Sequence, residues 1–281
     1  MKTTRKMICL GPAGAFSHQA AVWFSRELGL SLDFCFQNKN EDILPAIASD
    51  PEAVGVIAVE NTTAGFVLPV VQAWREHYSV KGLPLKAGGE RWLPIAHHLQ
   101  VKPGSDLDKI TVVMSHRQAL AQCQRFISKS GWPTREVAST ALAAAMAAND
   151  QSGQTAAIAS VLAADLYGLH IAERNIQDNA KNRTHFILIG RTSPPPTGSD
   201  RTIVMFCLPN VAGALFRLLE PFASRNINLS HITSITEGDG ERPSLFYTEI
   251  DCHLDSHPEL AVKLKELTTE LVVLGSFPKA D

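Results

Sequence analysis

The sequence contains no apolar run long enough to cross a membrane. A transmembrane helix needs roughly 18 or more consecutive apolar residues, and the alanine-rich runs at 141–148 and 156–164 are short and flanked or interrupted by polar residues. Basic residues open the chain, but only about four apolar residues precede Gly11, fewer than the roughly seven that the core of a secretory signal peptide requires. We therefore predict a protein of the cytoplasm.

Clustered charge and paired cysteines are also missing. The 281 residues include 26 Lys and Arg and 28 Asp and Glu, which gives a formal net charge of −2. Proteins that bind nucleic acid or an anionic membrane normally present a basic surface, so neither partner is expected. The cysteine count is odd and no Cys-x-x-Cys or Cys/His spacing occurs, which argues against a disulfide framework and a zinc site. The five cysteines are Cys9, Cys35, Cys123, Cys207 and Cys252.

The sequence does have enough apolar material for ordered domains. Hydrophobic residues make up 45% of the chain and charged residues 19%, a composition that excludes intrinsic disorder as the main state. The length favours about two domains. Three successive prolines, Pro194 to Pro196, predict an extended connector at 191–200, because proline cannot donate a backbone hydrogen bond. The connector separates a first part, residues 1–190, from a second part, residues 201–281.

In the first part, short apolar runs of strand length alternate with helical patterns. This alternation predicts an α/β fold with largely parallel sheets. The expected strands are residues 6–10, 54–59, 110–114, 136–138, 156–159 and 185–189. The expected helices are 117–129 after Ser115, 140–148 after Ser139 and 161–166 after Ser160, together with a helix that opens at Ser17.

The second part has a different order of elements. It alternates as strand, helix, strand, strand, helix, strand, which is the ferredoxin-like βαββαβ pattern. The expected strands are 202–208, 227–235, 244–252 and 271–277, and the expected helices are 212–224 and 258–268.

The joints between strands and helices in the first part carry hydroxyl side chains. In open α/β folds such joints gather at the carboxyl ends of the strands, where ligands bind. Hydroxyls and unpaired backbone N–H groups at helix N-termini can hold a small anion without arginine. Serine and threonine are also ordinary helix caps, so a single joint carries no functional signal. Four such joints together favour an anion-binding cleft.

Three further segments place polar side chains where a strand ends or begins. Glu60 and Asn61 follow an apolar strand, and they either face a ligand or cap the next helix. His97 and His98 follow the apolar run 92–96, where a histidine is more often a core or surface group than a catalyst. Thr184 enters the last strand, where it either donates a hydrogen bond or is simply a β-branched strand residue.

Motifs for nucleotide binding and for common hydrolases are absent. Gly11-Pro12-Ala13-Gly14 follows an expected strand but lacks the third glycine of a dinucleotide fingerprint and the Gly-Lys-Ser/Thr of a P-loop. Neither Gly-x-Ser-x-Gly nor His-Glu-x-x-His occurs.

Five motifs, in their order along the chain, resemble those of the prephenate dehydratases, and the second part resembles the ACT regulatory domain attached to those enzymes. The motifs are Gly11-Pro12-Ala13-Gly14-Ala15-Phe16-Ser17, Glu60-Asn61-Thr62 with Gly65 and Val67, Ser115-His116-Arg117-Gln118-Ala119-Leu120 with Gln122-Cys123, Ser139-Thr140-Ala141, and Asn182-Arg183-Thr184-His185-Phe186. In the second part, Gly213-Ala214-Leu215 resembles the phenylalanine-binding motif of that domain. The resemblance covers nearly the whole chain.

The resemblance implies a two-lobed catalytic domain similar to the periplasmic binding proteins, with lobe one at residues 1–84 and 177–190, lobe two at 85–176 and the active site in the cleft. The implied enzyme is a carbon–oxygen lyase that converts prephenate to phenylpyruvate, with loss of water and carbon dioxide, in L-phenylalanine biosynthesis. No metal or organic cofactor is implied. The implied partners are prephenate, L-phenylalanine as an effector, and further copies of the chain in a homodimer or homotetramer formed through the ACT domain.

The resemblance also assigns roles to residues. Thr184 assists the departing ring hydroxyl, either as a proton donor or by orienting it, because an alcohol is a poor acid. Glu60 and Asn61 shape the pocket around it. The implied substrate-binding residues are Ser17, Thr62, Ser115, Arg117, Gln118, Ser139, Thr140 and His185, and the implied effector-binding residues are Gly213, Ala214 and Leu215.

The sequence departs from the family pattern at several positions. The family usually has threonine at Ala15, serine at Thr62, proline at Arg117 and arginine at His185. Histidine does not offer the bidentate geometry of arginine toward a carboxylate, and we expect Arg117 to supply the missing charge. In the ACT domain, residues 233–236 replace the Glu-Ser-Arg-Pro motif, and Glu241-Arg242-Pro243-Ser244 is displaced from its place, which argues against phenylalanine feedback.

Three alternatives stay open. A non-aromatising prephenate decarboxylase would result if the leaving hydroxyl were not assisted, and the presence of Thr184 argues against it. Arogenate, the amino counterpart of prephenate, is an alternative substrate. A catalytically weak amino-acid-sensing regulator is an alternative of another class.

Overall fold

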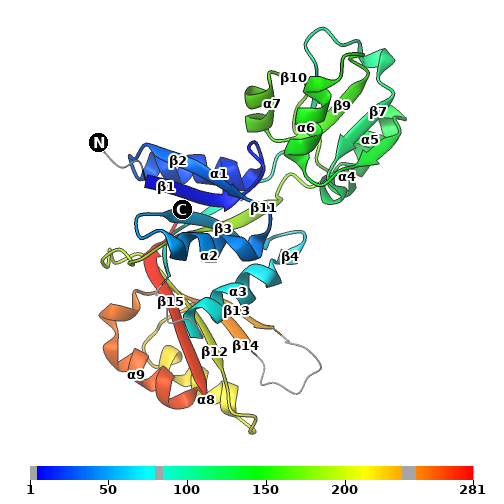
Figure 1. The fold of residues 1–281 in the computed structure, drawn as a ribbon. Helices are drawn as coiled ribbons and strands as arrows, with labels where there is room; N and C mark the ends of the chain where they lie inside the picture. The colour runs from blue at the N-terminus through cyan, green and yellow to red at the C-terminus, as the bar shows by residue number, and fades with distance from the viewer. Residues whose placement is uncertain (1–4, 80–84, 236–244, 281) are drawn as a thin grey trace. The chain divides into compact units, whose positions relative to one another are not determined.

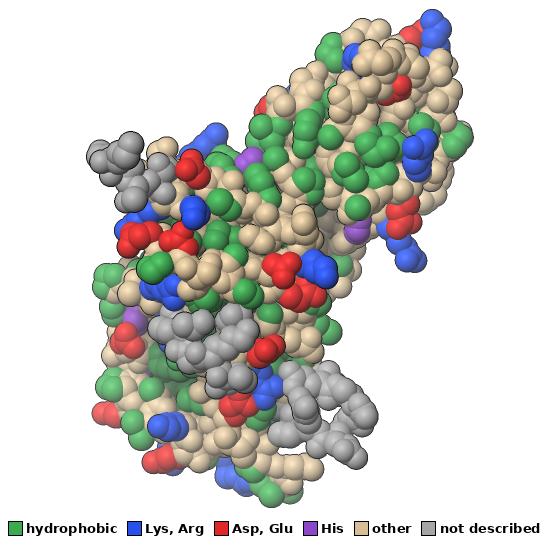
Figure 2. All heavy atoms as spheres, viewed as in Figure 1, with side chains coloured by type: hydrophobic (Ala, Val, Ile, Leu, Met, Phe, Trp, Pro, Cys, Tyr) green, Lys and Arg blue, Asp and Glu red, His purple; other side chains and the backbone are tan. Residues whose placement is uncertain are grey.

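Two compact units make up the chain in the computed structural model, which describes residues 5–79, 85–235 and 245–280. Unit 1 consists of Met1–Ile43, Val56–Phe66 and Trp92–Phe186, and unit 2 of Leu44–Gly55, Val67–Arg91 and Ile187–Asp281. Among the described residues, no helix is both long enough and apolar enough to cross a membrane. On the face shown in Figure 2, acidic and basic side chains are interspersed, in keeping with a net charge near zero.

The first sheet has the strand order β2-β1-β3-β11-β5, with the short β4 paired to β3. Figure 1 labels all of these strands except β5. Its strands are β1 (Arg5–Leu10), β2 (Leu32–Gln37), β3 (Val54–Asn61), β4 (Gly65–Phe66), β5 (Lys86–Pro94) and β11 (Arg183–Gly190). The accompanying helices are α1 (Phe16–Glu27), α2 (Ile43–Ser49) and α3 (Leu68–Ser79). The expected strands 6–10, 54–59 and 185–189 are confirmed. β5 contains two adjacent glycines and three charged residues, and only its last three residues belong to the apolar run 92–96, so its sequence does not predict a strand of this length.

The second sheet has the strand order β10-β6-β9-β7-β8 and lies within unit 1. Its strands are β6 (His98–Val101), β7 (Val112–Ser115), β8 (Thr134–Glu136), β9 (Thr155–Ala159) and β10 (His170–Glu173). Its helices are α4 (Arg117–Gln122), α5 (Gln124–Ser130), α6 (Thr140–Asn149) and α7 (Val161–Tyr167). β7 pairs in parallel with β8 and β9, but β6 is antiparallel to β9 and β10. The sheet is therefore mixed, and the expectation of largely parallel pairing is wrong for it.

Two details of the expected helices are also wrong. The helix expected at 117–129 is two helices, because Cys123 leaves helical geometry at φ −117° and ψ 22°. The cap of α4 is His116, whose Nδ1 accepts a hydrogen bond from the Gln118 N–H at 3.3 Å, and not Ser115. Ser17 does not cap α1 either, since that helix begins at Phe16.

Alanine is what lets the helices of the second sheet approach it closely. Ala143, Ala144 and Ala147 of α6 are fully buried against Ala157 and Ala159 of β9. Small side chains at these positions leave room for dense packing of helix on sheet. The run 141–148 thus lies in a helix, as predicted, whose alanine face is buried while Leu142 is exposed.

The third sheet has the order β13-β14-β12-β15 with antiparallel pairs, and it lies within unit 2. Its elements are β12 (Asp200–Cys207), α8 (Ala214–Ala223), β13 (Leu229–Ile235), β14 (Leu245–Ile250), α9 (Pro258–Leu267) and β15 (Glu270–Pro278). Leu218 of α8 and Leu260 of α9 join Val204, Phe206 and Ile250 in one core, so both helices cover the same face of the sheet (Figure 1). The βαββαβ prediction is confirmed.

Single-turn 3-10 helices among the described residues lie at Asn40–Asp42, Leu107–Lys109 and Leu254–Ser256.

Within unit 2, a buried ion network ties β5 to the third sheet. Arg201 of β12 contacts Glu90 of β5 at 2.7 Å and Glu249 of β14 at 3.1 Å, and the side chains of all three are at most 10% exposed. Lys86 of β5 also donates from Nζ to the Val273 carbonyl of β15 at 2.7 Å. Buried charges need such partners, because an unpaired one would be costly to desolvate.

Candidate active site

The side chain of Asn61, the last residue of β3, is held in one orientation by the turn that follows it. Its Oδ1 accepts hydrogen bonds from the backbone N–H groups of Thr63 at 3.0 Å and Ala64 at 2.9 Å. A backbone N–H can only donate, so the atom that faces these two groups must be the amide oxygen. The Asn61 NH2 group therefore faces the opposite side, toward the start of β11.

Two side chains of the β11 region accept hydrogen bonds from the Asn61 amide. Nδ2 donates to Thr184 Oγ1 at 2.9 Å and to Asn182 Oδ1 at 2.9 Å. Because the amide nitrogen can only donate, the Thr184 oxygen is an acceptor in this contact and its own proton remains available for another acceptor. A hydroxyl that accepts one hydrogen bond becomes a stronger donor, since successive hydrogen bonds polarise one another. Thr184 is thus prepared to donate to a bound molecule.

Asn182 collects several donors on one oxygen. Besides Asn61, its Oδ1 accepts from Thr63 Oγ1 at 3.1 Å and Thr62 Oγ1 at 3.4 Å. Its Nδ2 is buried and has no hydrogen-bond partner among the described residues. The contact with Asn61 excludes the flipped amide, because two NH2 groups would then face each other. The NH2 group of Asn182 is therefore a buried donor without an acceptor in the described part of the chain, and such groups are rare in proteins unless they have a function.

A pocket of about 290 Å³ lies beside this cluster, within unit 1. Its wall combines the turn after β3, helix α4 and the segment before β11, and amide side chains predominate in it. The lining residues are Thr63, Ala64, Gln118, Ala121, Gln122, Gln177, Asp178, Asn179 and Asn182. Its five amide side chains can offer neutral N–H donors to an anionic or hydroxyl-bearing ligand, and they stand beside one carboxylate, that of Asp178.

His97 contacts two of the glutamines in that wall. Its ring Nε2 lies 2.9 Å from Gln122 Oε1, and its backbone N–H donates to Gln177 Oε1 at 3.0 Å. The ring is buried and meets Phe16 edge-on, with ring centroids 5.3 Å apart. Burial lowers the pKa of His97, although the hydrogen bond to Gln122 acts in the opposite direction. The imidazole is therefore neutral near pH 7 and donates from Nε2.

Strand alternation separates Thr184 from its neighbours on β11. Side chains of successive strand residues point to opposite faces, so Arg183 and His185 share the face that Thr184 does not. His185 is fully buried and stacks on Trp92, with ring centroids 4.4 Å apart and planes 6° from parallel. The guanidinium of Arg183 lies over the same indole at 4.9 Å. His185 therefore lies on the other face of β11 from the Thr184 cluster, and its implied role in substrate binding stays a prediction.

The other residues implied by the resemblance divide into two groups. Asn61, Thr62 and Thr184 come together with Asn182, and Gln118 lines the adjacent pocket. Ser115 is fully buried and donates from Oγ to the Ile158 carbonyl at 2.6 Å, which ties β7 to β9. Ser139 caps α6 by accepting from Leu142 N–H at 3.0 Å. The positions of the rest are Glu60 on β3, half-buried; Ser17 in α1, buried; Thr140 at the start of α6, half-buried; and Arg117 at the start of α4, exposed.

The glycine-containing loop after β1 contacts helix α7. Ser160, the cap of α7, donates from Oγ to the Gly14 carbonyl at 2.7 Å, and Tyr167 donates to the Ala13 carbonyl at 2.9 Å. Gly14 has φ +87°, and a Cβ there would lie 3.1 Å from Ala163. The loop thus needs glycine both for its backbone angle and for the closeness of α7.

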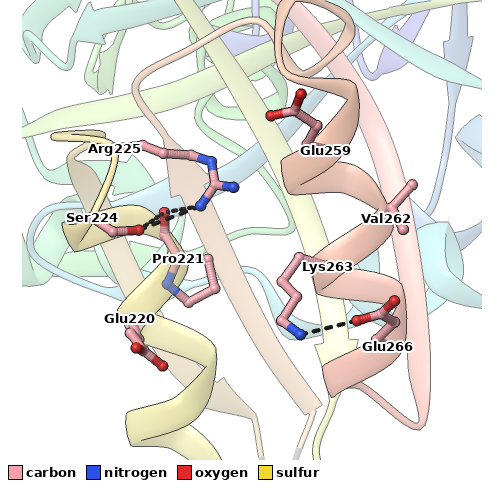
Figure 3. A pocket seen from close by; sticks show the side chains of 8 residues that line it. All are labelled: Glu220, Pro221, Ser224, Arg225, Glu259, Val262, Lys263 and Glu266. Atoms are coloured by element: carbon pink, nitrogen blue, oxygen red, sulfur yellow. Dashed lines mark hydrogen bonds and ion pairs between the residues drawn. The ribbon is translucent and has the colours of Figure 1, made fainter.

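The implied effector residues lie apart from the pocket of the third sheet. Gly213 is the N-cap of α8 at φ +78°, and Ala214 and Leu215 begin that helix. A pocket of about 460 Å³ lies between α8 and α9 (Figure 3), and none of the three residues lines it. Inside it, Lys263 pairs with Glu266 at 3.0 Å, and Arg225 donates to the Pro221 carbonyl at 3.0 Å. The displaced motif at 241–244 falls outside the described residues.

Sequence reasoning assigned no role to Asn182 or Gln122. Both belong to the recognised motifs, and an amide side chain has no distinctive sequence signal of its own. Asn182 contacts Asn61, which is 121 positions away in the sequence, and Gln122 contacts His97, which is 25 positions away. Only the tertiary structure brings these residues together, so no local sequence signal indicates the contacts.

Comparisons with known proteins match nearly the whole chain. The family model described as prephenate dehydratase matches residues 7–194, and the one described as ACT domain matches residues 202–267. The prephenate dehydratase of Methanocaldococcus jannaschii is 33% identical over 275 residues, which cover 96% of this chain and 97% of that protein. Arogenate dehydratase 2 of Petunia hybrida is 37% identical over 242 residues, 79% of this chain and 60% of that protein. The crystal structure of the Arthrobacter aurescens prephenate dehydratase in complex with L-Phe has a TM-score of 0.83 at 27% identity, covering 99% of this chain and 91% of that one.

Proposed function

The chain belongs to the prephenate dehydratase family and carries a C-terminal ACT domain, and we propose on this basis that it converts prephenate to phenylpyruvate. The family places it among the lyases. The domains we propose are a catalytic domain at residues 1–190, a connector at 191–200 and a regulatory domain at 201–281. The observation that best supports the reaction is the hydrogen bond from the Asn61 amide to the Thr184 hydroxyl.

The reaction requires assistance at the ring hydroxyl. The ring carboxylate leaves as carbon dioxide, and its bonding electron pair enters the ring. The ring becomes aromatic as the C–O bond breaks, and the departing hydroxide takes up one proton from solution and leaves as water. Aromatisation supplies the driving force, so the enzyme needs to stabilise charge on the departing oxygen and to hold the ring in place.

Thr184 is suited to stabilise that oxygen as a hydrogen-bond donor. Its own pKa lies far above neutral, so full proton transfer from it would be unfavourable. Accepting from Asn61 leaves its proton free and directs it, which is the preorganisation that electrostatic catalysis requires. Asn61 is in turn fixed by the Thr63 and Ala64 backbone.

The amides of the pocket are suited to bind the two carboxylates of prephenate. Gln118, Gln122 and Asn182 all line it, and Asn182 has an unused donor. Arg117, next to Gln118 on α4, would add a positive charge near the pocket. Ser139 and Thr140, at the N-terminus of α6, remain predicted anchors on the basis of the resemblance alone.

Product analysis of the purified wild-type protein with prephenate tests this function. We expect phenylpyruvate, detected by its absorbance in alkali, and carbon dioxide in equal amount. Carbon dioxide without phenylpyruvate would identify a non-aromatising decarboxylase, and neither product would identify a sensor. The likeness to an arogenate dehydratase makes arogenate the second substrate to test, with phenylalanine as its product. A higher kcat/KM for arogenate than for prephenate would reassign the substrate.

Regulation, assembly and location complete the proposal. We expect a cytoplasmic homodimer or homotetramer that assembles through the ACT domain. L-phenylalanine is the candidate effector, with Gly213, Ala214 and Leu215 as its candidate site, although the replaced motif at 233–236 argues against feedback. The complex of the related Arthrobacter enzyme with L-Phe supports the effector. Light scattering gives the oligomer size, and calorimetric titration with L-phenylalanine tests the effector. A monomer that binds no phenylalanine would contradict this part of the proposal.

A further inference from the structure

We infer that His97 is a positioning residue that orients the amides of Gln122 and Gln177 toward the substrate. The inference rests on the proposed function. Neither residue of the His97-His98 pair belongs to the motifs that carry the resemblance. The structure nevertheless places His97 directly behind the wall of the pocket.

The two contacts of His97 reach the same kind of atom on both glutamines. The ring nitrogen Nε2 faces Gln122 Oε1 at 2.9 Å, and the backbone N–H faces Gln177 Oε1 at 3.0 Å. An amide oxygen can only accept, so both contacts make His97 the donor. With each oxygen engaged by His97, each NH2 group is directed away from it. A glutamine without such a partner would be free to present either end of its amide.

The surroundings of the ring favour this proton arrangement. Nδ1 of His97 is buried and has no partner among the described residues. If Nε2 accepted a hydrogen bond instead, Nδ1 would carry a buried N–H without an acceptor, and orphaned donors are rarer in proteins than orphaned acceptors. The edge-on contact with Phe16 holds the ring plane. His97 is thus fixed by packing on one side and directs a single N–H toward Gln122.

The consequence for the substrate follows from its charge. A dianion needs N–H donors, and an amide that presents its oxygen would repel it instead. By fixing both glutamines, His97 removes the misoriented forms before the substrate arrives. Preorganised polar groups of this kind raise affinity without any contact between the positioning residue and the ligand.

Substitution of the ring tests the role, because the backbone contact to Gln177 persists in every variant. His97→Phe keeps an aromatic ring beside Phe16 but removes the donor to Gln122. We expect a rise in KM for prephenate of about tenfold, the loss typical of one hydrogen bond to a charged group, with kcat changed less than about threefold. His97→Gln restores an N–H donor at a similar reach, and we expect it to recover most of the loss even if His97→Phe folds poorly.

A double-mutant cycle distinguishes positioning from a general structural effect. If His97 acts through Gln122, adding His97→Phe to Gln122→Ala should raise KM no further than Gln122→Ala alone. His98→Phe is the matched control, since the neighbouring His98 is also buried but accepts from the Asn175 backbone, outside the pocket. The inference would be overturned if the effects of His97→Phe and Gln122→Ala on KM were additive, or if KM were unchanged in His97→Phe. In either case, a wild-type enzyme that converts prephenate would still support the proposed function. A wild-type protein that does not convert prephenate would overturn the proposed function itself, and this role with it.

Discussion

The amide of Asn61 donates a hydrogen bond of 2.9 Å to the hydroxyl of Thr184, a residue 123 positions away in the sequence. The contact joins the end of β3 to the start of β11, which are neighbours in the first sheet. The turn after β3 fixes the amide, and the amide fixes the role of the hydroxyl as a donor to whatever binds next to it.

Asn182→Asp should convert the unused donor of Asn182 into a repulsive group. At pH 8 the new carboxylate would face an anionic substrate, and we expect kcat/KM for prephenate to fall at least about tenfold. Lowering the pH should recover part of the loss, because a protonated carboxyl has one O–H donor. Asn179→Asp adds the same charge to the same pocket and is the matched control. Equal losses in both variants, without recovery at low pH, would show that only the charge of the pocket matters.

Arg117→Ala should weaken substrate binding. Arg117 is exposed at the start of α4, one residue from the pocket-lining Gln118, and its guanidinium would replace the arginine that His185 does not supply. We expect KM for prephenate to rise about tenfold or more, in line with the loss of a charge-assisted hydrogen bond. Arg125→Ala, at an exposed position of α5, controls for the general loss of positive charge. An unchanged KM in Arg117→Ala would remove this assignment.

Gly14→Ala should destabilise unit 1 more than an ordinary glycine substitution. Gly14 has φ +87°, and a Cβ there would lie 3.1 Å from the Ala163 backbone of α7. We expect a loss of about 1–3 kcal/mol in the free energy of unfolding, from backbone strain and crowding together. Gly29→Ala has a similar strain at φ +60° with no atom within 4 Å, so it separates the two causes. Urea unfolding measures the free energy of unfolding of both variants. Equal losses in Gly14→Ala and Gly29→Ala would argue against a tight contact between Gly14 and α7.

Acidification should destabilise the protein through three buried histidines. Burial lowers the pKa of His18, His97 and His98. The positive charge of Arg174 lowers the pKa of His98 further, and so does His97 once it is protonated. The unfolded chain binds protons at these sites from about pH 6.5 downward, while the folded protein resists them. The contribution of the neutral histidines to the free energy of unfolding is therefore fully present above pH 6.5. It decreases as the pH falls toward the lowered pKa values of the folded protein.

Urea titrations at pH 7.5, 6.5 and 5.5 measure that dependence. Carboxylates whose pKa is lowered, such as Asp150 at about 2, lose their contribution to stability only as the pH falls below the ordinary pKa of aspartate. They therefore do not affect the free energy of unfolding between pH 7.5 and 5.5. The variant His98→Gln should show a shallower decrease than the wild type. A free energy of unfolding that is constant from pH 7.5 to 5.5 would contradict the burial of these histidines in their neutral form.

Much of the architecture was accessible from the sequence because its signals are local. The apolar strands around Val56–Val59 and Ala156–Ala159, and the alanine-rich α6, follow directly from composition and periodicity. The break between α4 and α5 at Cys123 contains no glycine or proline, so the sequence does not predict it. β5 owes its place to pairing with β11 and not to an apolar pattern of its own.

The site could be predicted only in part, for a related reason. The sequence shows Asn61 and Thr184 as polar residues where a strand ends or begins, but their roles in the site follow from the resemblance and not from those positions. The face of the strand that a side chain takes is not accessible from the sequence. Ser115, implied as a substrate anchor, donates to the Ile158 carbonyl within its sheet, and its role stays a prediction. For the same reason, the sequence does not show that His185 stacks on Trp92 on the other face of β11.

The turnover of Thr184 variants tests the central claim most directly. The claim is that the Thr184 hydroxyl, held by Asn61, donates to the departing oxygen. Thr184→Ala should lower kcat for prephenate at least about 100-fold while the Kd of prephenate changes less than about threefold, and Thr184→Ser should keep kcat within about tenfold of the wild type. A Thr184→Ala enzyme that retains wild-type kcat would contradict the account.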